Sequence, residues 1–167
     1  MGFKEINIKD LTDNFEKIIS QEWMLVTAGD KEGYNMMTAS WGSIGEMWGK
    51  PCAVTVIRPQ RYTKTFLDQT DHFSISFYGD LKSIHQVCGS KSGREVDKTK
   101  ETGLTPVFAD NTVYFEQARL VLICKKAYVQ EMKPEYFVDR SLIDQWYPQK
   151  DFHFAYVGII EKVLCKE

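Results

Sequence analysis

The sequence predicts a mainly β protein, a β-barrel with peripheral helices, on three observations. Short apolar segments rich in β-branched and aromatic residues recur along the chain, turn residues separate them, and helical interruptions are few. No Gly-x-Gly-x-x-Gly follows the first strand, so a parallel dinucleotide-binding sheet has no support. The 167 residues have the length of about one domain, so we expect a single domain over 1–167.

The first element expected is an amphipathic helix over residues 11–19, with Asp10 as its N-cap and Leu11, Phe15 and Ile18 on one face. The strands expected after it are 23–28, 34–41, 52–57, 72–77, 113–115, 118–126 and 154–163. Helices are expected near 63–69, 80–88 and 94–102, and a turn near 139–145. In 72–77 phenylalanine and isoleucine alternate with serine, which predicts a strand with one buried face.

Composition narrows the function classes. A formal net charge of −2 gives no support for a nucleic-acid partner, and no apolar run is long enough for a signal core or a membrane span. The four cysteines, Cys52, Cys88, Cys124 and Cys165, lie far apart without a Cys-x-x-Cys pair. This spacing predicts neither a metal site nor a disulfide scaffold, but reduced thiols in a cytoplasmic protein.

Residues 35–42 (NMMTASWG) end one of the predicted strands. Thr38 and Ser40 place two hydroxyls at the strand exit among backbone amides, and such groups donate hydrogen bonds to a phosphate or to the polar edge of a ring. Trp41 could cover an aromatic ligand. The same pattern also fits an exposed polar strand end beside a buried tryptophan, and the residues alone leave both interpretations open.

Residues 58–65 (RPQRYTKT) follow the strand 52–57 and hold two arginines three positions apart, with Pro59 stiffening the loop between them. Thr63 or a neighbour is expected to cap the next helix. A helix N-terminus flanked by guanidinium groups is suited to an anion. Because helix N-termini normally favour acidic residues, a solvated basic loop remains the alternative.

Residues 88–94 (CGSKSGR) have the composition of a phosphate-binding loop without the spacing of a P-loop, and a flexible turn between helices is the simpler interpretation. The charged run 95–101 is interpreted as a solvated helix face. The three histidines show no metal or triad pattern, although His153 lies among aromatic residues and could face a pocket. With no catalytic residues to assign, the chemistry of an enzyme here would come from a bound cofactor.

Four ordered motifs, N-M-M-T-A-S-W, R-P-Q-R-Y-T, C-G-S-K-S-G-R-x-V-D-K and T-G-L-T-P, resemble those of the flavin reductase-like proteins, most closely the flavoredoxin-like branch. The resemblance runs from about residue 20 to the C-terminus. It implies the FMN-binding split-barrel fold and a homodimer that binds FMN at its interface. Carried to this chain, it implies flavin contacts from Asn35, Thr38, Ala39, Ser40 and Trp41, phosphate and ribityl contacts from Arg58, Arg61, Tyr62 and Thr63, and a closing loop of Cys88, Gly89, Ser90 and Lys91.

The activity that the resemblance implies is an FMN-dependent oxidoreductase, with NADH or NADPH as donor and a small molecule, a flavin or a redox protein as acceptor. The second hypothesis is an FMN-binding electron carrier with no nicotinamide site of its own. A third is a split barrel that has lost its cofactor, but the retained Arg58, Arg61 and Lys91 disfavour it.

Overall fold

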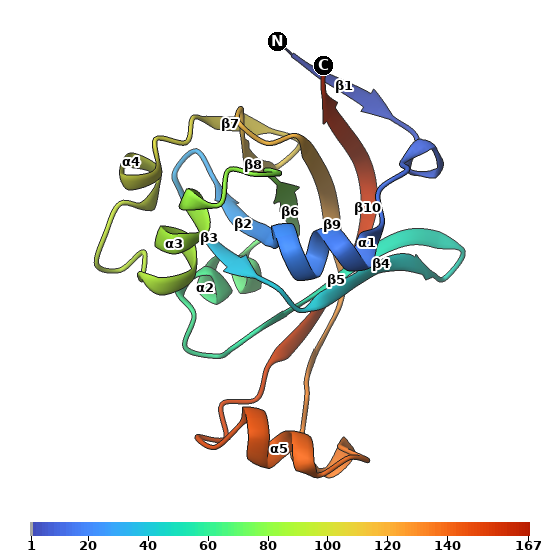
Figure 1. The fold of residues 1–167 in the computed structure, drawn as a ribbon, viewed down its shortest axis with the longest axis vertical. Helices are drawn as coiled ribbons and strands as arrows, with labels where there is room; N and C mark the ends of the chain where they lie inside the picture. The colour runs from blue at the N-terminus through green and yellow to red at the C-terminus, as the bar shows by residue number, and fades with distance from the viewer. Residues whose placement is uncertain (1) are drawn as a thin grey trace.

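The computed structural model describes residues 2–167 and is mainly β, as predicted (Figure 1). Its strands are β1 (Phe3–Ile6), β2 (Met24–Asp30), β3 (Gly33–Ala39), β4 (Gly42–Met47), β5 (Lys50–Ile57), β6 (His72–Phe77), β7 (Pro106–Ala109), β8 (Thr112–Phe115), β9 (Leu120–Glu131) and β10 (Phe154–Lys166). Its α-helices are α1 (Phe15–Lys17), α2 (Tyr62–Gln69), α3 (Ser83–Ser90), α4 (Lys98–Thr102) and α5 (Ser141–Trp146). Short 3₁₀ turns cover Ile8–Asp10 and Pro134–Tyr136, and a π-helical turn covers Ile18–Glu22.

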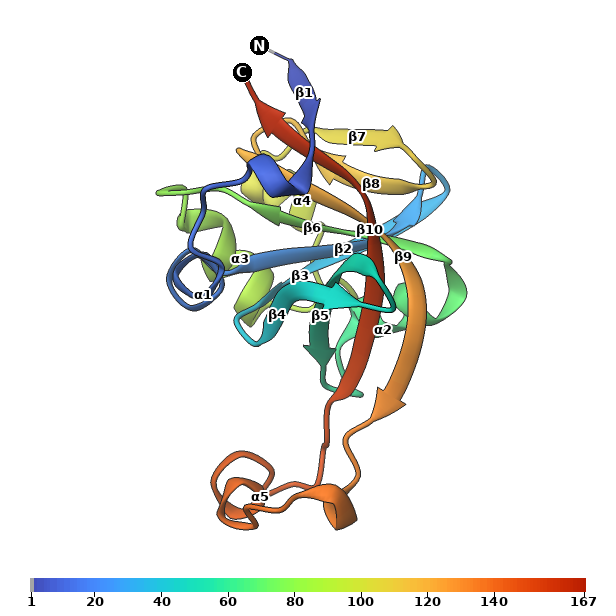
Figure 2. The same cartoon turned by 90° about the vertical axis from the view of Figure 1, so that its right-hand side faces the viewer.

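The main sheet is antiparallel and curls into an open barrel. Its order is β3–β2–β6–β9–β10–β5–β4, with β1 paired to β10, while β7 and β8 form a separate hairpin. The two edge strands β3 and β4 are joined by only Ser40 and Trp41. Six strand spacings would separate the edges of a flat sheet by roughly 29 Å, whereas the three Cα steps of this link span at most about 11 Å. The edges must therefore meet across a seam, and within residues 2–167 no ladder pairs β3 with β4 (Figure 2).

Both faces of the central strand β6 are buried, so the prediction of a single buried face is wrong. Phe73, Ile75 and Phe77 belong to the core inside the barrel, but Ser74 and Ser76 are also fully buried. The β7–β8 hairpin covers this second face, and the Ser74 hydroxyl donates to the carbonyl of Val113 at 2.6 Å. The alternation of serine with phenylalanine and isoleucine correctly separates the two faces of β6. The serine face is buried only because the β7–β8 hairpin covers it.

The N-terminal helix is shorter and later than the 11–19 expected. Asn14, not Asp10, is its N-cap and accepts from the backbone N–H of Lys17 at 3.0 Å. The helix then continues through the π-helical turn to Glu22. Arg119, directly before β9, forms ion pairs with Asp13 at 2.8 Å and with Glu22 at 2.7 Å. These tertiary contacts clamp the segment at both ends and thereby select its boundaries.

The sequence patterns did not indicate β1, β4 and β7, and the predicted strands 118–126 and 154–163 end earlier than β9 and β10 do. β4 is exposed on almost its whole length, so it has no alternating pattern to detect. β9 and β10 extend past the barrel into a projecting arm, defined as residues 132–153, which carries α5 (Figures 1 and 2). Among residues 2–167, no helix has the length and apolar character needed to cross a membrane.

Candidate functional site

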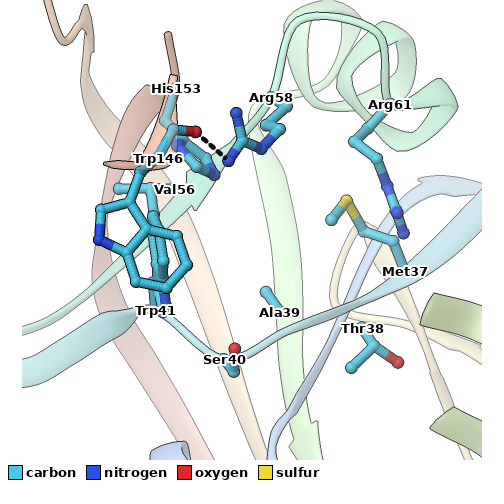
Figure 3. A pocket seen from close by; sticks show the side chains of 10 residues that line it. All are labelled: Met37, Thr38, Ala39, Ser40, Trp41, Val56, Arg58, Arg61, Trp146 and His153. Carbon is cyan, nitrogen blue, oxygen red and sulfur yellow. Dashed lines mark hydrogen bonds between the residues drawn. The ribbon is translucent and has the colours of Figure 1, made fainter. Parts of the chain in front are cut away.

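A cavity of about 440 Å³ opens at the seam of the barrel (Figure 3). We call it the seam cavity; it is lined by Met37, Thr38, Ala39, Ser40, Trp41, Val56, Arg58, Arg61, Trp146 and His153. The end of β3, the two-residue link, the end of β5 and the arm all contribute to it. The curl that brings the sheet edges together is therefore what assembles residues from distant parts of the chain.

One wall of the seam cavity is aromatic. The Trp41 ring meets Trp146 edge-on, with centroids 4.9 Å apart, and lies 5.1 Å from the His153 ring. Trp41 is 37% exposed, so the alternative of a buried tryptophan does not hold. The His153 Nδ1 and the Tyr147 hydroxyl share a hydrogen bond of 2.7 Å. Burial, reinforced by nearby Arg58, lowers the pKa of His153 to about 4, so its imidazole is neutral at pH 7.

Arg58 holds the arm against the barrel. Its guanidinium pairs with Asp151 at 2.9 Å and donates to the backbone carbonyl of Trp146 at 3.0 Å (Figure 3). It also lies over the Tyr147 ring, 5.0 Å from the centroid. These contacts use most of the N–H groups of Arg58. Arg58 therefore fixes the arm to the barrel, a role that the spacing of residues 58–65 did not indicate.

A second, smaller cavity of about 130 Å³ shares the lining residue Arg61 with the seam cavity. We call it the basic cavity; it is lined by Asn35, Gln60, Arg61, Tyr62, Thr63, Ser90, Lys91, Ser92, Gly93 and Lys98. The Arg61 guanidinium donates to the carbonyls of Cys88 and Gly89, each at 3.1 Å. These carbonyls belong to the C-terminal turn of α3, where the helix dipole favours a cation.

Lys98 adds a second cation to the basic cavity, and the interpretation of 95–101 as a solvated face is wrong at this residue. Lys98 is only 4% exposed, and its Nζ donates to the carbonyls of Met36 at 2.8 Å and Cys88 at 3.2 Å. Burial, with a smaller contribution from Arg61, lowers its pKa to about 8. Within residues 2–167, neither Arg61 nor Lys98 has a carboxylate within ion-pair distance. Two half-buried or buried cations thus face a cavity without a counter-ion.

Asn35 and Thr63 form a rigid floor beside these cations. The Asn35 amide donates to the Thr63 hydroxyl at 2.8 Å, and both residues are buried. The expected side-chain cap from Thr63 or a neighbour is not observed, because Arg61 occupies the N-cap position of α2 and its side chain forms no cap bond. Gly93 packs so closely that a Cβ there would lie 2.0 Å from the Asn35 Oδ1. The segment 91–97 is therefore fitted against β3 rather than free.

Residues 88–90 are the end of α3 rather than part of a loop. The Cys88 side chain is fully buried, and burial raises the pKa of its thiol to about 11, so only its carbonyl takes part in the site. Ser90 and Lys91 line the basic cavity, although Lys91 is also paired with Glu101 at 2.6 Å. A Cβ at Gly89 would lie 3.5 Å from the Thr38 Cβ, so α3 packs directly on the end of β3.

Lys98 and Trp146 line the two cavities, although no sequence pattern indicated them. Lys98 sits in a run of charges in which nothing distinguishes it from its exposed neighbours, and Trp146 reaches the cavity from the distant arm. Among the residues that the structure describes, no cluster of three His, Cys, Asp or Glu side chains could hold a metal ion.

An open antiparallel barrel with an aromatic cavity at its seam and a basic cavity beside it defines a split-barrel protein. The family model of the flavin reductase like domain matches residues 17–138, so the chain belongs to this family. Comparison with curated proteins gives no match. The structure is similar to flavoredoxin from Methanosarcina acetivorans, with a TM-score of 0.69, 20% identity, and coverage of 98% of this chain and 75% of that one.

Two further solved structures share the fold. An FMN-binding protein from Thermus thermophilus matches with a TM-score of 0.67 and 23% identity, covering 98% of this chain and 82% of that chain. The NADH:FAD oxidoreductase SgcE6 from Streptomyces globisporus C-1027 matches with a TM-score of 0.64 and 14% identity, covering 86% and 74%. At these identities the likeness establishes the fold alone.

Proposed function

We propose that the chain binds FMN, with the isoalloxazine ring in the seam cavity and the phosphate in the basic cavity. The observation that carries this proposal is the pair of Arg61 and Lys98, two cations that meet on the Cys88 carbonyl without a carboxylate partner in the described chain. Keeping uncompensated charges out of water costs free energy, and a bound phosphate would offset that cost. The family and the name of the Thermus thermophilus neighbour support a mononucleotide flavin.

The two cavities suit the two ends of FMN because they are neighbours that share Arg61 as a lining residue. Thr38, Ala39, Ser40 and Trp41 line the seam cavity and would contact the ring, while Arg61, Thr63, Ser90, Lys91 and Lys98 line the basic cavity and would contact the phosphate. Asn35 and Tyr62 also line the basic cavity, whereas Arg58 lines only the seam cavity. We therefore assign Arg58 to the ring end, through the arm that it holds, rather than to the phosphate.

The proposed activity is an oxidoreductase that takes a hydride from NADH or NADPH. Bound FMN would supply the redox chemistry by accepting a hydride and passing electrons to an acceptor. The wall of Trp41, Trp146 and neutral His153 would flank a second flat ring and keep water from it. The named activity of the Streptomyces globisporus neighbour supports a nicotinamide donor, and the four free cysteines fit the reducing cytoplasm where we place the reaction.

An FMN-binding electron carrier without a nicotinamide site is the second candidate, favoured by the structural likeness to flavoredoxin. In this case a redox protein, not a nicotinamide, would exchange electrons with the bound flavin. The two candidates share the same cavities and differ only in whether the aromatic wall admits a nicotinamide.

We also propose that the chain works as a homodimer. The arm exposes Met132, Tyr136, Val138, Leu142 and Trp146, of which Val138 is fully exposed. Beside it, an apolar groove of about 380 Å³ runs along the arm and the ends of β9 and β10, lined in part by Tyr128, Phe137 and Val157. An apolar surface of this kind is typical of an interface between subunits. The arm also borders the seam cavity through Trp146 and His153, so a second copy seated here would lie near that cavity.

An absorption spectrum tests the function directly. The purified protein is reconstituted with FMN, desalted, and then treated anaerobically with NADH and, separately, with NADPH. Retained flavin bands that bleach with one nucleotide establish the reductase and identify its donor. Retained flavin that neither nucleotide reduces selects the carrier, and loss of all flavin on desalting rejects FMN as a bound cofactor.

A further inference from the structure

His85 is a buried polar side chain that the proposed FMN contacts leave unexplained. It lies in the first turn of α3, is 5% exposed, and its Nδ1 shares a hydrogen bond of 2.7 Å with the Thr38 Oγ1. Its other ring nitrogen, Nε2, is buried and has no hydrogen-bond partner. Thr38 lines the seam cavity, so its hydroxyl connects the cavity to an imidazole that has one bonded and one unbonded ring nitrogen.

The protonation of His85 decides what Thr38 can offer to a ligand. Burial and nearby Lys82 lower the pKa of His85 to about 4, so the imidazole carries one proton at pH 7, on either Nδ1 or Nε2. If Nε2 carries it, Nδ1 must accept from the Thr38 hydroxyl, and Thr38 turns only lone pairs toward the cavity. If Nδ1 carries it, Nδ1–H donates to Thr38 Oγ1, and the hydroxyl hydrogen is free.

The surroundings of Nε2 favour the second arrangement. The imidazole packs edge-to-face with Trp23, at 5.7 Å between centroids, and with Tyr78 at 6.3 Å. No oxygen or nitrogen acceptor within the described chain reaches Nε2. A buried N–H without an acceptor is among the rarest features of native proteins, and an unused acceptor is tolerated more often. The proton therefore belongs on Nδ1, and the Nδ1–H donates a hydrogen bond to Thr38 Oγ1.

We propose that His85 is a positioning residue for the seam cavity: its Nδ1–H donates to Thr38 Oγ1 and leaves the threonine O–H to donate to an acceptor atom of the bound ligand. The identity of the ligand rests on the proposed function, and the ring nitrogens and carbonyl oxygens of a flavin are acceptors of this kind. α3 packs on the end of β3 at Gly89 and so holds the pair in register.

The first test reads the tautomer in the protein without ligand. In ¹⁵N-histidine-labelled protein at pH 7, long-range ¹H–¹⁵N spectra distinguish a protonated Nδ1 from a protonated Nε2, and a His85→Asn variant assigns the signals. We expect the Nδ1–H form. An Nε2–H form overturns the proposal, because Thr38 would then donate to His85 and not to a ligand.

The second test compares FMN dissociation constants by fluorescence quenching. Thr38→Val removes the hydroxyl without changing the shape, and His85→Phe removes the donor that orients it; each should weaken binding by about fivefold, the net worth of one neutral hydrogen bond. The double variant should lose no more than either single one, because the two residues serve one contact. His85→Asn, whose amide N–H can replace Nδ1–H, should retain more affinity than His85→Phe. Independent, additive losses overturn the proposal.

The two tests also separate failure of the inference from failure of the proposed function. If the unmodified protein does not bind FMN, the proposed function is wrong, and the tautomer alone then decides whether Thr38 is held as a donor. If FMN binds but the Nε2–H form is found, the function stands and the role of His85 does not. Thermal unfolding of each variant without FMN confirms that the fold is retained.

Discussion

Lys98 keeps an ammonium group in an almost fully buried position, held by two backbone carbonyls rather than by a carboxylate. Such an arrangement lowers stability relative to an apolar side chain of similar length, because the charge loses its hydration. The lysine can stabilise the protein only when an anion enters the basic cavity. Its contribution should therefore be seen in ligand binding and not in the stability of the free protein.

Lys98→Met should weaken FMN binding by about 10- to 100-fold, the loss of a charge-assisted hydrogen bond worth roughly 1.5–3 kcal/mol. The free protein should unfold at the same temperature or higher. The matched control is Lys100→Met, on the same helix but exposed, which should leave affinity nearly unchanged. Isothermal titration and thermal unfolding measure the two quantities, and equal loss of affinity in both variants would exclude a phosphate role for Lys98.

Gly93→Ala tests the fit between the basic cavity and β3. The new methyl group would lie 2.0 Å from the Asn35 Oδ1, so it must displace Asn35 and break its hydrogen bond to Thr63. We expect a loss of about 1–3 kcal/mol in the free energy of unfolding, the cost of overpacking a buried site. Gly45→Ala is the control, since a Cβ there meets nothing within 4 Å. Urea denaturation that shows the same stability for both variants would contradict the close packing at Gly93.

At the scale of elements, the arm depends on contacts far from it in sequence. The Arg58 guanidinium binds the backbone carbonyl of Trp146 and the carboxylate of Asp151, both in the arm. The Gln60 amide donates to the same carboxylate at 2.8 Å. These bonds place Trp146 and His153 at the seam cavity. Without them the arm would keep its internal packing of Phe137, Tyr147 and Phe152 and the contacts of Trp146 and His153 with the Trp41 ring.

Arg58→Met should loosen the arm while the barrel stays folded. A partly exposed ion pair contributes up to about 1 kcal/mol, so backbone amides in 140–152 should exchange with deuterium up to about fivefold faster. Amides of β6, inside the barrel, should keep their protection and serve as the internal control. If the arm amides of the variant exchange as slowly as those of the unmodified protein, Arg58 does not hold the arm.

The boundaries of elements show where local sequence is sufficient. β6 begins and ends where it was predicted, because alternating Phe, Ile and Ser over 72–77 is a strong strand pattern between turn residues. β4 has no such pattern, since it lies at an edge and its side chains face solvent. It forms because β5 offers a pairing partner and because Trp48 and Gly49 adopt the positive φ values, 56° and 67°, of a tight hairpin turn.

At the scale of the whole molecule, the exposed apolar arm predicts self-association. Leu142→Asp places a charge on this surface and should shift the protein from dimer to monomer in light scattering after size-exclusion chromatography. Leu81→Asp makes the same change at a leucine of similar exposure, 42% against 39%, on another part of the surface, and should leave the dimer intact. A monomeric unmodified protein would reject the proposed homodimer.

Stability should fall as the pH drops from about 6.5 to 4. Burial lowers the pKa of both His85 and His153 to about 4 in the folded protein, from the ordinary value of 6.5. Over this window the unfolded chain binds more protons than the folded one, so the free energy of unfolding rises with pH. Replacing both histidines by asparagine should flatten the change between pH 7 and pH 5 in urea denaturation. An unchanged slope would show that these histidines are accessible to protons in the folded state.

The sequence by itself determined the mainly β class, most strands of the barrel and the three polar segments at 35–42, 58–65 and 88–94. Each of these depends on local patterns, namely alternation, turn residues and clustered hydroxyl or basic side chains. What only the tertiary structure decided is which side chains of those segments share a cavity. Curling of the sheet brings the end of β3 and the end of β5 to one cavity. Packing of α3 buries Cys88, and α4 directs the Lys98 side chain toward the Cys88 carbonyl. Burial and charge balance are properties of contacts between distant segments, so they do not appear in any local pattern.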